Sequence, residues 1–143
     1  MTGSIKAFAR AVVVGACAGG GPFLLFTLPI ALDRIGRNGF DEILFVATLP
    51  IQIAGATVFA AMILCGLPLT AWLAREERED PQTYAAIGIG LGIAIPIVVF
   101  TALDSTGLGF FFAGPGSFAG FVTARSWGRW REKIRVFAAA EFE

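Results

Sequence analysis

The sequence contains no histidine, and it has few charged residues for its length. Of its 143 residues, 15% are charged and 56% are hydrophobic. The absence of histidine removes the commonest metal and haem ligand and the commonest general base. The two cysteines, Cys17 and Cys65, lie inside apolar runs, which is typical of small buried side chains rather than of a disulfide or a metal pair. We therefore expect a protein with neither metal nor other cofactor.

Charge is also absent from four long stretches of the chain. Residues 11–32, 43–74, 85–103 and 106–124 contain no Asp, Glu, Lys or Arg. A helix needs about 20 apolar residues to cross the hydrocarbon core of a bilayer, and backbone groups in lipid must bond within their own segment. The sequence therefore predicts an all-α membrane protein, a single domain whose four transmembrane helices cover about 11–32, 45–66, 85–103 and 106–124.

The connections between these runs are short and carry turn and capping signals. Asn38-Gly39 is a turn signal, Asp41 can cap the second helix, and Asp80-Pro81 reads as a cap followed by proline in the first turn. Residues 104–107 form the last predicted turn. Short connections place successive helices side by side, so we expect an up-down bundle in which each helix packs against the next. Pro68 is expected to bend residues 67–73 out along the membrane interface.

Basic residues are distributed unevenly between the two predicted sides of the membrane. Arg34 and Arg37 lie on one side. The other side has nine basic residues, which are Lys6, Arg10, Arg75, Arg78, Arg125, Arg129, Arg131, Lys133 and Arg135. The positive-inside rule then places both termini in the cytoplasm. The chain has nine arginines against two lysines and much alanine and glycine, a composition associated with GC-rich genomes. We therefore expect a bacterial protein of the inner membrane.

One alternative for the N-terminus is a signal sequence that ends at a lipid-modified Cys17. Only six residues separate Arg10 from Cys17, fewer than the 7–15 of a signal-peptide apolar region. The apolar run also continues well beyond the cysteine. These lengths favour a retained first helix.

Glycine and proline occur in a repeated pattern within the spans. Three G-x-x-x-G motifs lie close to prolines, and the residues concerned are Gly15, Gly19, Pro22, Gly88, Gly92, Pro96, Pro115, Gly116 and Gly120. One interpretation is close helix packing, since small residues four apart let two backbones approach. The other is a binding site, because secondary transporters bind substrates where helices are interrupted at mid-membrane.

Polar residues within the spans are few. Gln52 has the strongest polar side chain near mid-membrane, where it either bonds to another helix or lines a pore for a neutral solute. Intramembrane carboxylates and bases, which coupled transport and proton relays use, are missing from the predicted cores. A catalytic nucleophile would likewise have no base within reach, so we expect a protein that is not an enzyme.

The C-terminal residues 125–143 combine tryptophan with basic residues. Trp127, Trp130, Ile134 and Phe137 recur at helical spacing, and the basic residues fall largely off that stripe. This pattern predicts an amphipathic helix in the membrane interface. Contact with anionic lipid or with a partner is expected for Trp72, Trp127, Arg129, Trp130, Arg131, Lys133 and Arg135.

These observations favour a non-catalytic accessory, assembly or scaffold subunit of a membrane complex, packed through its glycine-rich faces. The expected partners are the lipid bilayer, anionic lipid at the cytoplasmic face, and either further copies of the chain or a larger membrane complex. No feature indicates nucleic-acid binding. The alternative function is a small oligomeric channel or transporter for a neutral or weakly polar solute.

Overall fold

The computed structural model describes residues 2–33, 39–76 and 79–140, and every element in these ranges is a helix. Four helical stretches are long and apolar enough to cross a membrane, namely Gly3–Asp33, Phe40–Arg75, Pro81–Ala102 and Thr106–Ala138. The all-helical character and the four spans predicted from the sequence are therefore confirmed. Each helical stretch extends beyond its predicted span at one end at least, and flanking charged residues such as Lys6, Arg75 and Arg129 are also helical.

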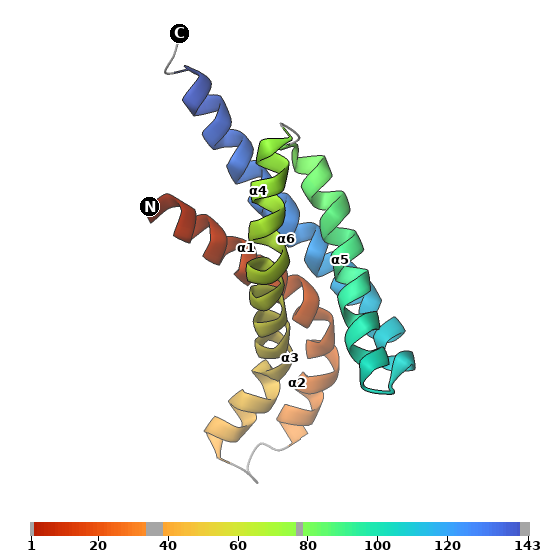
Figure 1. Cartoon of the computed structure of the whole chain (residues 1–143). Coiled ribbons are helices and arrows are strands. Elements are labelled where there is room, and N and C mark those ends of the chain that lie inside the picture. Colours follow the sequence, from red (N-terminus) through yellow and green to blue (C-terminus); the bar gives the residue numbers. More distant parts are fainter. Residues whose placement is uncertain (1, 34–38, 77–78, 141–143) are drawn as a thin grey trace.

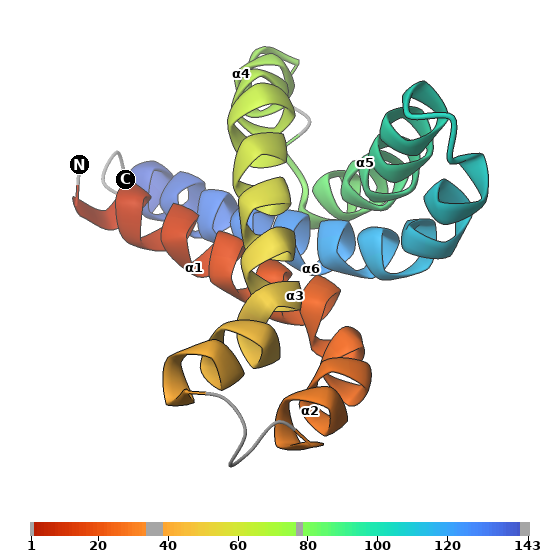
Figure 2. The same ribbon diagram turned by 90° about the horizontal axis from the view of Figure 1, so that it is seen from below.

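The first span is interrupted near its middle. It consists of α1 (Thr2–Gly20), a 3₁₀ turn η1 (Gly21–Phe23) and α2 (Leu24–Asp33), and Pro22 lies in the turn. Figure 2 shows that α1 and α2 run in different directions on either side of this turn. The bend brings Gly20 against the second span, where an added Cβ would lie 2.7 Å from the Ile51 Cα.

The second span contains a π-helical turn. It consists of α3 (Phe40–Ala61), the π turn η2 (Met62–Gly66) and α4 (Leu67–Arg75). We expected Pro68 to bend residues 67–73 away, but α4 continues the line of α3 in both views (Figures 1 and 2). Pro68 lies where the π turn passes into α4, and the helix runs through it without a break. The predicted Asp41 cap is also wrong, because Gly39 is the N-cap and Asp41 lies in the first turn.

The third and fourth spans are α5 (Pro81–Ala102) and α6 (Thr106–Ala140). Asp80 caps α5 as predicted, since its Oδ2 accepts hydrogen bonds from the backbone N–H groups of Gln82 and Thr83 at 3.0 and 3.2 Å. Asp104 makes the turn between the two helices with a φ of 54°. Residues 125–140 do not form a helix of their own, because they continue α6 directly.

The helix neighbours differ from those of a simple up-down bundle. The extensive contacts join α5 to α6, α1 to α6, α1 to α3, and α2 to α3. Consecutive second and third spans were expected to pack together, yet among the described residues α3 has no extensive contact with α5. The first and fourth spans form the centre of the molecule instead. Small residues such as Gly19 and Ala119 allow this central contact.

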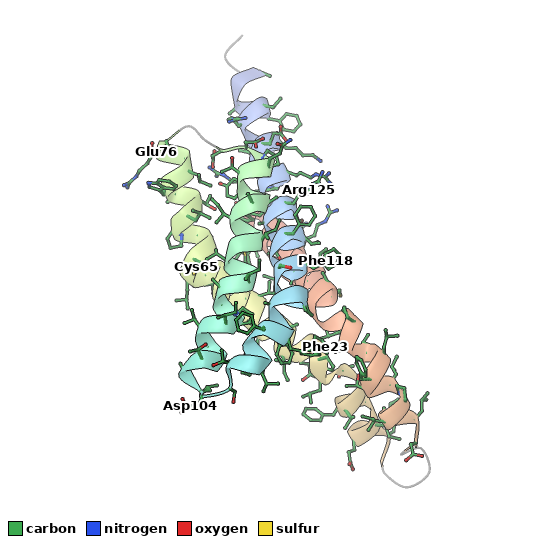
Figure 3. All side chains as sticks on the ribbon, turned by 90° about the vertical axis from the view of Figure 1, so that its right-hand side faces the viewer. Phe23, Cys65, Glu76, Asp104, Phe118 and Arg125 are labelled. Atoms are coloured by element: carbon green, nitrogen blue, oxygen red, sulfur yellow. The ribbon has the colours of Figure 1, made fainter. Side chains whose placement is uncertain are left out.

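The buried core lies at the end of the molecule where α4 ends and α5 begins. Leu73, Tyr84, Trp127, Met62 and Ala11 form it, and Leu73 is only 1% exposed. At the opposite end the hairpin of α2 and α3 diverges from the α5–α6 turn that contains Asp104 (Figure 3). Most large apolar side chains lie outside this core and are exposed, as a lipid-facing surface requires.

Candidate functional site

The glycines of α5 and α6 face one another. An added Cβ on Gly88 or Gly92 would overlap the carbonyl groups of Gly120 and Gly116 respectively, and the reverse substitutions would overlap the carbonyls of α5. The two backbones therefore lie in direct contact over two turns of helix. Two of the three predicted G-x-x-x-G motifs are thus each other's partners within one chain.

The third motif inserts α1 between α6 and α3. A Cβ on Gly19 would lie 3.0 Å from the Ala119 Cβ and 3.6 Å from the Ala54 Cβ. Gly15 lies against the hydroxyl of Thr123, which is buried, and has no hydrogen-bond partner among the described residues. The glycine-rich faces are therefore occupied inside the chain, and they support the packing interpretation of these residues.

The gap between α3–α4 and α5 forms an apolar groove of about 730 Å³. Glycine and alanine of all four spans contribute to its walls, namely Gly19, Ala54, Ala61, Gly66, Gly88, Gly92, Gly116, Ala119, Gly120 and Ala124. Pro96 and Pro115 also line it, whereas Pro22 is exposed outside it. The groove extends from Trp127 and Tyr84 at the core end to Phe100 and Phe111 near the α5–α6 turn, and none of its lining residues is charged.

The groove offers few polar atoms. Thr57 donates its hydroxyl hydrogen to the Ile53 carbonyl at 2.9 Å, and Thr27 donates to the Phe23 carbonyl at 3.4 Å. Gln52 does not line the groove; it is exposed, and its Nε2 donates to the Thr48 Oγ1 at 2.8 Å. Within the described part of the chain, Gln52 therefore bonds within its own helix and lies outside the groove.

A polar cluster joins three helices at the core end of the groove. The Trp127 Nε1 donates to the Thr70 Oγ1 at 2.9 Å, and the Thr70 hydroxyl in turn donates to the Gly66 carbonyl of the π turn at 2.8 Å. Glu79 accepts from the Tyr84 hydroxyl at 3.2 Å and from the Arg131 Nε at 2.8 Å. The sequence does not reveal the roles of Thr70 and Glu79, because their partners on α6, Trp127 and Arg131, lie 57 and 52 positions farther along the chain.

The aromatic and basic residues predicted to contact lipid divide into two groups. Trp127 is 6% exposed and Trp130 packs on it with ring centroids 4.7 Å apart, so the start of the predicted lipid-facing stripe lies against the protein. Arg131 is paired with Glu79. The remaining predicted contacts are exposed, and they are Trp72, Arg129, Lys133 and Arg135.

Comparison with known proteins adds no further assignment. The chain matches no protein-family model, and no curated protein or solved structure is significantly similar to it.

In the ranges that the structure describes, no three His, Cys, Asp or Glu side chains gather to hold a metal ion. The free cysteines Cys17 and Cys65 lie on different spans, exposed and half-buried respectively.

Proposed function

We propose that this protein is a non-catalytic accessory or scaffold subunit of a membrane complex, and that it receives an apolar transmembrane helix of a partner subunit in the groove between α3–α4 and α5. The observation that carries the proposal is the groove itself. It extends along the spans, its lining has no charged side chain, and ten of its 32 lining residues are glycine or alanine. Small residues let a helix approach closely in a membrane, where packing rather than hydrophobicity drives association.

The internal use of the glycine motifs supports this choice of surface. Gly15, Gly19, Gly88, Gly92, Gly116 and Gly120 already pack within the chain. Five of these six glycines also line the groove, so a partner helix meets them only along the part of their surface that the contacts within the chain leave open. The partner is expected to present an uncharged helix with its own small residues on the contacting face.

The proposed setting is the bacterial inner membrane, with four spans crossing in alternate directions and both termini in the cytoplasm. The orientation is supported by the excess of basic residues in the terminal segments and in the connection between the second and third spans. Exposed apolar residues of the last turns of α6, including Ile134 and Phe137, alternate there with Lys133 and Arg135. This part of α6 is proposed to lie in the interface against anionic lipid.

The proposal is tested by photo-crosslinking of the full-length protein in cells. A photoreactive phenylalanine derivative at Val99 lies in the groove, and one at the adjacent Val98, which is exposed at 65% against 47% for Val99, lies outside it. The Val99 derivative should give a discrete adduct whose crosslinked peptide maps to an uncharged transmembrane segment of another protein. The Val98 derivative should not give that adduct.

A groove-filling variant supplies the control. Leu91→Trp places a larger side chain in the groove wall and should abolish the Val99 adduct while the protein still accumulates in the membrane. Identical adducts from Val98 and Val99, or adducts with lipid alone, would overturn the proposal. Adducts with other copies of this chain alone would replace the accessory subunit with a homo-oligomer, as the channel alternative requires.

A further inference from the structure

A second concavity, of about 590 Å³, lies on the outer side of the α5–α6 hairpin and shares no lining residue with the groove. It is formed where the first turns of α5 meet the middle of α6, at the end that carries the C-terminal helix turns. Its lining residues are Asp80, Pro81, Gln82, Ala85, Ala86, Ile89, Phe121, Arg125, Arg129 and Glu132.

Two arginines in this concavity lack a carboxylate partner. Arg125 and Arg129 are one helical turn apart on α6, and neither forms a salt bridge with any residue that the structure describes. The Arg125 guanidinium carbon lies 5.5 Å from the centre of the Phe121 ring, so its planar fork rests on an aromatic face. Guanidinium groups held in this way are suited to bidentate binding of a phosphate.

Two carboxylates stand on the rim of the same concavity. Asp80 is held by the N–H groups of Gln82 and Thr83, and Glu132 is exposed one turn beyond Arg129. Glu132 also forms no ion pair within the described ranges. The concavity therefore carries two positive and two negative side chains. A purely anionic ligand would satisfy the arginines and meet repulsion from the acids, whereas a ligand with a phosphate and an ammonium group would satisfy both.

The floor and the lower edge of the concavity are apolar. Ile89 and Phe121 line the part of the concavity nearest the middle of the spans. Ile93 and Phe118 continue this exposed apolar surface farther in the same direction. Figure 3 shows Phe118 and Arg125 on the same side of α6. This order of hydrocarbon surface, phosphate-binding arginines and carboxylates matches the order of groups along a phospholipid.

We propose that this concavity binds one phospholipid with a primary-amine head group, of the phosphatidylethanolamine class. Arg125 and Arg129 hold its phosphate, Glu132 and the rim carboxylate of Asp80 accept its ammonium group, and its acyl chains lie along Ile89, Phe118 and Phe121. The site adds selectivity that a general attraction of the basic tail to anionic lipid does not supply. It stands independently of the partner helix in the groove.

Native mass spectrometry of the full-length protein in mild detergent tests the assignment. Phosphatidylethanolamine, phosphatidylglycerol and phosphatidylcholine with identical acyl chains are added in equal amounts. Phosphatidylethanolamine should give the most abundant single-lipid adduct. The double variant Arg125→Gln, Arg129→Gln should weaken that adduct about tenfold or more, as loss of charge-assisted hydrogen bonds predicts.

Matched variants separate the site from general electrostatics. Glu132→Gln should remove the preference for phosphatidylethanolamine over phosphatidylglycerol while keeping a bound lipid. The control Lys6→Gln, Arg10→Gln removes the same charge from exposed positions that do not line the concavity, and it should leave the phosphatidylethanolamine adduct unchanged. Glycerophosphoethanolamine, which has no acyl chains, should fail to compete.

Three results would overturn the proposal. These are equal adducts with the three lipids, an equal loss in the control variant, and effective competition by glycerophosphoethanolamine. Circular dichroism of each variant establishes that the helices are intact. Because the substituted side chains are exposed, the fold is expected to persist in every variant.

Discussion

The indole N–H of Trp127 donates a hydrogen bond to the hydroxyl of Thr70 at 2.9 Å, across 57 positions of the sequence. Both side chains are buried, at 6% and 8% exposure. This hydrogen bond joins α6 to the first turns of α4, directly after the π turn of the second span. It helps to hold α4 beside the α5–α6 hairpin at one end of the groove, while the second and third spans remain apart farther along.

Thr70→Val should destabilise the protein, because it leaves the buried Trp127 N–H without an acceptor. The expected loss is about 1–3 kcal/mol of unfolding free energy, measured by denaturation in mixed detergent micelles. Thr70→Ser keeps the hydroxyl and should lose clearly less. Equal stability of the valine and serine variants would contradict a role for this hydrogen bond.

Gly92→Ala should destabilise the α5–α6 hairpin by about 1–3 kcal/mol, since its Cβ would overlap the Gly116 carbonyl. Gly90→Ala, two positions away, is the matched control because an added Cβ there meets nothing within 4 Å. In the same micelle assay the control should be neutral or more stable by about 0.5–1 kcal/mol. Equal losses at both positions would show that the backbone contact is not responsible.

The tryptophans should differ in their access to lipid. In single-tryptophan variants reconstituted with brominated lipid, fluorescence of Trp72 should be quenched more strongly than that of Trp127, because their exposed fractions are 53% and 6%. Quenching by aqueous iodide should also leave Trp127 largely unaffected. Comparable lipid quenching of the two residues would place Trp127 at the lipid surface, as its sequence pattern alone suggests.

Reporter fusions test the proposed orientation. A fusion after Glu143 and one after Arg75 should both report the cytoplasm, and one after Asp33 should report the opposite side, because basic residues favour the cytoplasmic face. Each position is tested with two reporters, alkaline phosphatase, which is active outside the cytoplasm, and a fluorescent protein, which is active inside it. Opposite signals from the two reporters at one position supply the control. A C-terminus outside the cytoplasm would reverse the orientation.

Capping and span formation follow largely from local sequence. Asp80 followed by Pro81 begins α5 as expected, since a capping carboxylate needs only the next two or three N–H groups. The four charge-free runs become helices because a backbone in hydrocarbon must bond within its own segment. Pro68 does not produce the bend expected from the sequence, because the helix runs from a π turn through this residue without a break.

The sequence by itself therefore determined a four-span, all-helical membrane chain and the residue types that pack its helices. Tertiary structure decided which helices are neighbours, and with that the groove, the concavity beside Arg125 and Arg129, and the burial of Trp127. Gly90 and Gly92 look alike in the sequence, yet one is open and the other touches a backbone. Helix formation depends on hydrogen bonds a few residues apart, whereas helix pairing depends on complementary surfaces from distant segments, which no short stretch of sequence contains.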